Sequence, residues 1–466
     1  MLENDTICAL STPSGSGAIG VIRLSGAESI KIVETIFKGK KLSEQATQSL
    51  HFGKIVTGEE VIDEVMLSLF REPKSYTGEN VIELSCHGSS YILTQVIQLL
   101  LENGARLANP GEFTQRAYLN GKMDLAQAEA VADLIASESK MAHQLALNQM
   151  RGGFSEKIQE LRNELIQFTS LIELELDFAE EDVEFADRQD LKDLVEKLLD
   201  MINNLVDSFA TGNVMKNGIP VAIVGKPNVG KSTLLNALLN EEKAIVSEIA
   251  GTTRDSIEDE VTIGGVNFRF IDTAGLRETD DLVENIGIKR TYEMLEKASI
   301  VLYLVDAIDG DKHHIYQVVE EIKAKIEGSD KHLVLLANKV DKGNFDLAHL
   351  PDELKAKFPL DVKTIYLSAL KKYRVEELTN YLKTLAEEQL QGANEVIVSN
   401  ARHHQALKTA GEALQRVSEG LENNITGDFL AMDIRQALHY LGEITGSIEI
   451  DRDILGTIFS QFCIGK

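Results

Sequence analysis

One short segment constrains the fold of this chain more than any other feature: residues 225–232 read GKPNVGKS. An apolar run, Val221–Val224, precedes this segment, and the spacing of apolar residues from Leu234 to Leu239 predicts a helix after it. A glycine-rich turn between a strand and a helix lets backbone N–H groups converge on a phosphate, and the helix N-terminus adds a favourable dipole. The pattern therefore predicts a phosphate-binding loop on a parallel α/β sheet.

The residue types within this loop suit the phosphates of a nucleotide. We expect Lys231 to bridge the β- and γ-phosphates, and the hydroxyl of Ser232 to ligate Mg²⁺. The loop backbone and the first helical turn supply further contacts, which the pattern assigns to Asn228, Val229, Gly230 and Thr233. The alternative is a glycine-rich turn without a ligand, which the flanking strand and helix disfavour.

A second motif follows a later apolar run, where residues 272–275 read DTAG. Parallel sheets bind their ligands at the carboxyl ends of strands, and this motif falls at such an end. We expect Asp272 to hold a magnesium-bound water and the amide of Gly275 to contact the γ-phosphate. The loop is completed by Thr273 and Ala274.

A third motif predicts which base is bound, because residues 338–341 read NKVD after another apolar run. The carboxylate of Asp341 can accept both the N1–H and the N2–H₂ donors of guanine. Adenine offers neither donor at that edge, so the acid would be left unpaired. Asn338 can contact the other edge of the base, and the stem of Lys339 can cover its ring. The last base-contacting loop is predicted at Ser368 and Ala369. The ordered set of motifs predicts GTP as the ligand.

Hydrolysis of GTP needs a second magnesium ligand, a positioned water and a compensating positive charge. Residues 251–255 read GTTRD, and Thr253 is the natural second protein ligand for Mg²⁺. Ras-like proteins carry a water-positioning glutamine directly after the second motif, but here that residue is Leu276. Residue chemistry alone leaves four acids open for this role: Glu278, Asp280, Asp281 and Glu284. Asn228 can ligate a monovalent cation or can simply stabilise its loop.

The regions on either side of these motifs predict a multidomain α/β and α protein. Residues 1–119 mix short β-rich runs with turns and helical stretches, which predicts an N-terminal α/β domain. Helical periodicity covers residues 120–215 and returns in residues 385–466, so we expect one discontinuous helical domain. Residues 216–384 alternate strands and helices, which predicts an inserted Ras-like P-loop GTPase domain with a mostly parallel sheet. Residues 211–217 read as a linker ahead of it.

Composition limits the partners and the compartment. Acidic residues number 74 against 47 basic ones, and the net charge is −27, so contact with RNA requires a local basic patch or a partner protein. No apolar run is long enough to span a membrane. The three cysteines are far apart in sequence, which suits a reducing compartment. We therefore expect a cytoplasmic protein with no membrane partner.

Longer motifs throughout the chain resemble those of one family. The N-terminal part contains TPSG at 12–15, RLSG at 23–26, YTGE at 76–79, PGEFT at 110–114 and NGKMDLAQAEA at 120–130. The GTPase part contributes Asn228, the GTTRD segment and Leu276, and residues 462–466 read FCIGK. Together these motifs resemble the MnmE (also TrmE) family of tRNA-modification GTPases, and the resemblance covers the whole chain.

The resemblance implies a tRNA-modifying enzyme with a one-carbon donor. It implies a homodimer that meets through N-terminal domains, which bind a tetrahydrofolate derivative of the 5-formyl or 5,10-methylene type. Positions that match the family's folate contacts are Arg23, Glu83, Lys122 and Lys466. It also implies a heterotetramer with an FAD-dependent MnmG-type protein. That complex adds an aminomethyl or carboxymethylaminomethyl group to C5 of the wobble uridine of certain tRNAs.

The resemblance also bears on how GTP is hydrolysed. In the family K⁺ enters the nucleotide site and couples hydrolysis to the association of two G domains. The positions that match its K⁺ site are Asn228, Ser247, Ile249 and Thr252. The family's water-orienting glutamate falls on Glu284, and its C-terminal cysteine matches Cys463, to which we assign a catalytic role in the modification.

A rival interpretation is a regulatory GTPase of ribosome assembly, a binding switch without modification chemistry. The GTPase motifs alone do not separate the two, because both classes share them. The N-terminal block and the FCIGK tail favour the tRNA-modifying enzyme, since a ribosome-assembly switch has no reason to carry them.

Overall fold

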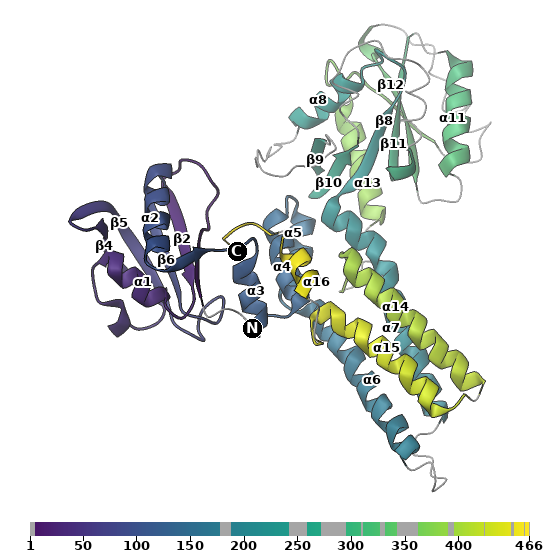
Figure 1. Ribbon diagram of the computed structural model, residues 1–466. Coiled ribbons are helices and arrows are strands. Elements are labelled where there is room, and N and C mark those ends of the chain that lie inside the picture. Colours follow the sequence, from purple (N-terminus) through teal and green to yellow (C-terminus); the bar gives the residue numbers. More distant parts are fainter. Residues whose placement is uncertain are drawn as a thin grey trace. The chain divides into compact units, whose positions relative to one another are not determined.

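Figure 1 shows the computed structural model, in which contacts divide the chain into two compact units. The residues that it describes are 5–177, 188–241, 259–271, 295–308, 311–326, 331–342, 362–389, 396–423, 425–448, 452–460 and 462–465. Unit 1 comprises Met1–Ala136, Ala146–Asn203 and Gln405–Lys466, and unit 2 comprises Ser137–Leu145 and Asn204–His404.

Unit 1 begins with a seven-stranded sheet of order β3-β4-β5-β6-β2-β1-β7. The strands are β1 (Thr6–Leu10), β2 (Ile19–Ser25), β3 (Phe37–Lys38), β4 (Ser49–Thr57), β5 (Glu60–Phe70), β6 (Val81–His87) and β7 (Ala105–Leu107). Buried residues alternate with more exposed ones along β5 and β6, because successive side chains of a strand point to opposite faces. The buried ones pack with residues of α1 (Ser29–Ile36) and α2 (Ser90–Glu102), which cover one face of the sheet (Figure 1).

The other face of this sheet carries exposed apolar side chains. Leu50 and Phe52 on β4 are 67% and 62% exposed, and Met66 on β5 is 42% exposed. Phe52 lies opposite Met66, and Glu83 on β6 lies opposite Arg23 on β2. The register across β5 and β6 puts all five side chains on the same face.

The helices outside the first sheet follow an apolar period close to 3.6 residues. They are α3 (Glu112–Leu119), α4 (Leu125–Ala136), α5 (Lys140–Met150), α6 (Gly153–Asp177), α7 (Arg188–Asn217), α14 (Ala401–Glu422), α15 (Gly427–Thr445) and α16 (Arg452–Ser460). The buried stripe of α15 includes Leu430, Ile434 and Leu441, and α15 packs against α6. Since α6 precedes the GTPase motifs and α15 follows them, helices from both sides of these motifs pack together, and the bounds of the helical domain stay a prediction. Among the described helices, none combines the length and the apolarity of a membrane span.

A buried charge cluster joins α3 to the first sheet. Arg116 is 1% exposed, and its guanidinium pairs with three carboxylates, those of Asp5 (2.6 Å), Glu79 (3.2 Å) and Glu112 (3.0 Å). Arg106 adds ion pairs at 2.6 Å to Asp5 and at 2.7 Å to Glu112. Two arginines thus form ion pairs with three carboxylates, and these ion pairs offset the free-energy cost of removing the charges from water.

Unit 2 contains a six-stranded sheet of order β13-β12-β11-β8-β10-β9. Its strands are β8 (Ile219–Val224), β9 (Asp259–Ile263), β10 (Val266–Phe270), β11 (Ile300–Asp306), β12 (His332–Asn338) and β13 (Lys363–Tyr366). Only β9 pairs antiparallel, so the expected mostly parallel sheet is confirmed. One face packs against α8 (Lys231–Glu241) and α13 (Val375–Gln389), and the other against α11 (Lys312–Ile326).

The predicted linker at residues 211–217 is wrong, because α7 remains helical to Asn217. The stretch is rich in Thr, Gly and Asn, residues that are typical of loops, and that composition suggested a linker. The helix instead ends at Gly218, which has a φ of +78° and whose amide donates to the carbonyl of Val214 at 2.9 Å. A glycine in the left-handed conformation commonly ends a helix in this way, and β8 begins at the next residue.

We expect Arg116→Met to lower the free energy of unfolding of unit 1 by about 3–5 kcal/mol, because three carboxylates then lose a buried partner. The matched control is Lys31→Met, which removes a pair with Glu28 whose side chains are 81% and 54% exposed. This control should leave the free energy of unfolding almost unchanged, because water and salt screen an exposed pair. Urea unfolding of both variants measures the difference, and equal losses would contradict the role given to the buried cluster.

Candidate functional site

The phosphate loop follows β8, at the point where the strand order of unit 2 reverses. The chain runs from β8 through α8 to β9 and β10 on one side, and then to β11 on the other side of β8. Open α/β sheets bind ligands outside the carboxyl ends of strands at such a point. Asp306 and Asn338, which end β11 and β12, lie opposite each other in the parallel register.

The loop after β8 approaches its neighbours so closely that position 230 requires glycine. The φ angle of Gly230 is +103°, and a Cβ at this position would lie 2.4 Å from Nδ2 of Asn338. A side chain here would therefore push the loop away from Asn338. The next residues begin α8, where Ser232 is half-buried and Thr233 is exposed on the first turn.

Lys231, the first residue of α8, folds its side chain back over the phosphate loop. Its Nζ donates to the carbonyl of Gly225 at 2.9 Å and to that of Lys226 at 3.0 Å. Burial lowers the pKa of Lys231. These two contacts hold the ammonium beside the loop. Phosphate oxygens can replace the two carbonyls there, because a hydrogen bond between two ionised groups is stronger than one to a neutral carbonyl.

The side chain of Asn338 joins the phosphate loop to the base-side loop. It is 2% exposed, its Nδ2 donates to the carbonyl of Val229 at 2.8 Å, and its Oδ1 accepts from the amide of Ala369 at 2.9 Å. The sequence predicted that Asn338 contacts an edge of the base. The described contacts give it a bracing role between two loops, and the base contact stays a prediction.

Lys339 also reaches from the base-side motif to the phosphate loop. Its Nζ donates to the carbonyl of Asn228 at 2.7 Å and pairs with the carboxylate of Asp306 at 2.7 Å. The backbone of Lys339 has a φ of +69°, in the left-handed region. Its aliphatic stem therefore spans the two loops, which is the geometry needed to cover a planar ring.

Asp341 presents an exposed carboxylate that a buried serine orients. The hydroxyl of Ser368 donates to Oδ1 of Asp341 at 2.6 Å. This hydrogen bond is the main cause that lowers the pKa of Asp341, with smaller help from Lys371 and Lys342. The backbone of Ser368 exchanges two hydrogen bonds of 3.0 Å with Tyr373, which closes the loop. An ionised, oriented carboxylate is the acceptor that the two guanine donors require.

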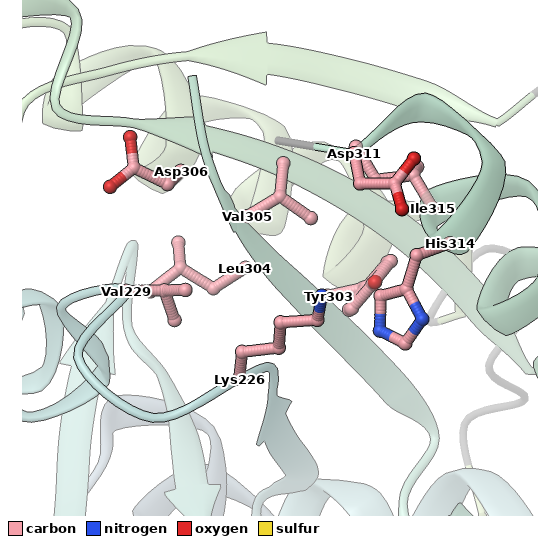
Figure 2. Close-up of a pocket in the computed structure, with 9 residues that line it drawn as sticks. All are labelled: Lys226, Val229, Tyr303, Leu304, Val305, Asp306, Asp311, His314 and Ile315. Carbon is pink, nitrogen blue, oxygen red and sulfur yellow. The ribbon is translucent and has the colours of Figure 1, made fainter. Parts of the chain in front are cut away.

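A recess lies beside the phosphate loop at the start of α11 (Figure 2). It is lined by Lys226, Val229, Tyr303, Leu304, Val305, Asp306, Asp311, His314 and Ile315. Two of its acids already have structural partners: Asp311 accepts from the amide of His313 at 3.0 Å, and Asp306 pairs with Lys339. Contacts at the start of α11 and at the end of β11 therefore explain the positions of Asp311 and Asp306.

Several predicted site residues lie outside the described residues, and their roles stay predictions. They are Ser247, Ile249, Thr252, Thr253, Asp272, Thr273, Ala274, Gly275, Glu284 and Lys466. The structure does bring together the phosphate loop, the NKVD motif and the Ser368–Ala369 loop, which are far apart in sequence.

In unit 1, Arg23 and Glu83 form a second candidate site. The guanidinium of Arg23 binds Oε1 of Glu83 through Nε and Nη2, both at 2.8 Å. Its central carbon lies 5.4 Å from the ring centre of Tyr76 and 5.7 Å from that of Phe113. Arg23 keeps 17% of its side chain exposed, and Glu83 keeps 26%. A partly exposed ion pair beside aromatic rings is suited to bind a polar heterocycle.

The C-terminal tail reaches this second site. Nη1 of Arg23 donates to the carbonyl of Gly465 at 3.4 Å, and the neighbouring Cys463 is exposed. Cys8 and Cys86 are buried, and burial raises their pKa to about 11 and about 12, so Cys463 is the accessible thiol of the three. Lys122 donates to the carbonyl of Pro73 at 3.0 Å, and the described contacts do not join it to Arg23.

Sequence reasoning missed several residues that shape these two sites. Asp306 had a detectable signal, because it is an acid at the end of a strongly apolar strand. Tyr76 and Phe113 lay within motifs of the resemblance but had no chemistry of their own to mark them. The serine that binds the tail, Ser11, belongs to no motif, and its contact with Gly465 spans almost the whole chain.

The fold and the arrangement at the end of β8 define a P-loop GTPase. Two family profiles match the chain: the MnmE helical domain over residues 125–463, and the GTP-binding protein TrmE N-terminus over residues 6–122. The chain therefore belongs to the MnmE family of tRNA-modification GTPases, and it is a GTP-hydrolysing enzyme.

Individual relatives agree with this assignment over their full length. The chain is 57% identical to the tRNA modification GTPase MnmE of Christiangramia forsetii, and 53% identical to those of Flavobacterium psychrophilum and Bacteroides thetaiotaomicron. Each comparison covers 100% of both chains. Among solved structures, Aquifex aeolicus Era bound to GDP·AlF4⁻ is 30% identical over 42% of this chain and 66% of that chain, with a TM-score of 0.29.

Two substitutions should separate base selection from bracing. Asp341→Asn replaces an acceptor by a donor, so the affinity for GTP should fall by about 10- to 100-fold while xanthosine triphosphate becomes a good ligand. Asn338→Ala removes the brace between two loops, so the affinities for both nucleotides should fall by a similar factor. Titration of each variant with the two nucleotides measures this. An altered base preference in Asn338→Ala, or an unaltered one in Asp341→Asn, would contradict these assignments.

Proposed function

We propose that this GTPase modifies C5 of the wobble uridine of certain tRNAs, with a tetrahydrofolate derivative of the 5-formyl or 5,10-methylene type as the one-carbon donor. The product carries an aminomethyl or carboxymethylaminomethyl group. An FAD-dependent MnmG-type protein shares the reaction in a heterotetramer. The observation that carries the proposal is the Arg23–Glu83 pair, which has aromatic rings and the tail carbonyl of Gly465 as neighbours.

The surroundings of Arg23 supply the kinds of contact that a reduced folate needs. A pterin ring presents N–H donors, for which Glu83 offers an acceptor. The glutamate portion of a folate carries carboxylates, for which Arg23 and, as the family resemblance implies, Lys122 and Lys466 offer positive charge. The rings of Tyr76 and Phe113, which lie beside Arg23, give an apolar wall. A site that combines these groups is typical of a small-molecule cofactor.

The exposed face of the first sheet supports a homodimer formed by the N-terminal parts. Leu50, Phe52 and Met66 are exposed on the face that also carries Arg23 and Glu83. Contiguous exposed apolar side chains mark interaction surfaces, and most soluble oligomers are symmetric pairs. A second copy on this face would bring both Arg23–Glu83 pairs to one interface.

The nucleotide site supports a role for K⁺ in hydrolysis. The side chain of Asn228 is exposed on the phosphate loop, where its amide oxygen can ligate a cation together with groups of Ser247, Ile249 and Thr252. A cation at this place supplies the positive charge that an arginine finger supplies in other GTPases. In this proposal Ser232 and Thr253 hold Mg²⁺, Glu284 orients the water, and Cys463 takes part in the modification.

Replacing K⁺ by Na⁺ should slow GTP hydrolysis on the order of 100-fold, because the charge at the transition state is then poorly placed. Asn228→Ala should hydrolyse GTP at the same low rate in both salts. The measurement is phosphate release at fixed ionic strength, with nucleotide affinity determined beside it. Equal rates of the unsubstituted protein in the two salts would remove K⁺ from the mechanism.

The tRNA reaction is tested by nucleoside analysis of tRNA from cells that lack this protein. We expect the wobble uridines to lack the C5 group. A gene for the unsubstituted protein should restore the modified uridines, whereas a gene for Arg23→Ala should not. Ser16→Ala, which alters an exposed residue of a nearby loop, is the control that should restore them fully. Unchanged wobble uridines in the deletion strain would favour the ribosome-assembly switch instead.

A further inference from the structure

The last described residues of the chain, the tail segment Phe462–Gly465, are held on unit 1 at two points. At one end Phe462 is buried in a cluster with Leu125 and Phe459, and the carbonyl of Cys463 accepts from the amide of Gly111 at 3.4 Å. At the other end the carbonyl of Gly465 accepts from a serine just after β1 and from an arginine of β2. Cys463 thus belongs to the first attachment through its carbonyl and precedes the second by two residues.

The second attachment is made by residues of β2 and of the chain just after β1. The hydroxyl of Ser11 donates to the carbonyl of Gly465 at 3.0 Å, and Nη1 of Arg23 donates to the same oxygen at 3.4 Å. Ser11 is itself fixed, because its amide donates to the carbonyl of Val21 at 2.7 Å. One carbonyl oxygen of the tail thus has two donors, and one of them belongs to the Arg23–Glu83 pair.

The tail fits against β1 only if position 465 is glycine. The φ angle of Gly465 is +96°, and a Cβ there would lie 2.3 Å from the carbonyl oxygen of Leu10. This oxygen is backbone and belongs to the sheet, so it does not move aside as a flexible side chain would. The close approach is independent of the hydroxyl of Ser11 and offers a second way to disturb the same attachment.

We infer that Ser11 is a positioning residue of the tRNA-modification reaction, which with Arg23 seats the tail segment beside the Arg23–Glu83 pair. The seated tail sets where Cys463 stands relative to that pair. The reaction that it serves rests on the proposed function, whereas the attachment itself rests on the contacts of Ser11, Arg23 and Gly465 alone. Ser11 acts through the tail and does not itself touch a reacting group.

Hydrogen exchange at the amide of Gly111 reports whether the tail is seated, because this amide donates to the tail carbonyl of Cys463. Ser11→Ala should speed its exchange about fivefold, the factor that corresponds to one lost hydrogen bond. Ser11→Thr, which keeps the hydroxyl, should exchange like the unsubstituted protein. Ser16→Ala, an exposed hydroxyl in the following loop, should also leave the rate unchanged. Mass spectrometry of the peptide that contains Gly111 gives these rates.

Gly465→Ala should detach the same end of the tail by a different change. It should raise the exchange rate at Gly111 at least as much as Ser11→Ala does. The double variant with Ser11→Ala should exchange no faster than Gly465→Ala alone, because both changes release one attachment. Additive effects, or an exchange rate in Ser11→Ala equal to that of the unsubstituted protein, would overturn the inference. Thermal unfolding of each variant shows whether unit 1 itself remains folded.

Binding of 5-formyltetrahydrofolate separates this inference from the proposed function. We expect Ser11→Ala to bind it about fivefold more weakly, in proportion to the loss of the seated tail, and Ser11→Thr to bind normally. Equal binding by Ser11→Ala and the unsubstituted protein would show that the seated tail is no part of the site and would overturn the positioning role. If the unsubstituted protein binds no reduced folate, the proposed function fails, and the exchange rates still decide whether Ser11 holds the tail.

Discussion

The side-chain amide of Asn338 holds the nucleotide site of unit 2 together. Its N–H donates to the phosphate loop at Val229 and its oxygen accepts from the base-side loop at Ala369. The amide has a donor and an acceptor on separate atoms, so an ionised carboxylate or an apolar residue would release one loop or both. The brace fixes the separation of the two loops, which we predict to bind opposite ends of one nucleotide. Gly230 is part of the same constraint, because a larger residue would occupy the space of that amide.

Backbone strain gathers around this brace. Among the described non-glycine residues, positive φ angles occur at Gln48, Asn228, Lys339, Lys372 and Arg374. All but Gln48 belong to the loops that surround the nucleotide site. Such conformations cost about 1–3 kcal/mol each and persist only where the surroundings hold them. The bond from Lys339 to the carbonyl of Asn228 ties two of the strained residues to each other, so one loop stabilises the other.

What could be predicted from the sequence was local or carried by a motif. Short β-rich runs predicted strands within residues 1–119, where β1 to β7 lie, and the order of apolar runs predicted the mostly parallel sheet. The end of α7 was missed because polar composition looked like a linker, whereas one glycine decides where the helix stops. The bracing role of Asn338 and the tail contact of Ser11 were missed for another reason. Each depends on partners more than 30 residues away along the chain, and no local pattern encodes such an approach.

Two arginines of unit 1 differ in how their surroundings neutralise the charge of the guanidinium. Arg116 is 1% exposed and pairs with three carboxylates, two of which also pair with Arg106, so its charge is neutralised within the protein. Among the described residues, Arg23 pairs with one carboxylate, has aromatic rings beside it, and donates from Nη1 to a tail carbonyl. A neutral carbonyl is a weaker partner than an anion. Arg23 therefore retains the capacity to bind a ligand that Arg116 has lost, even though both side chains belong to the same unit.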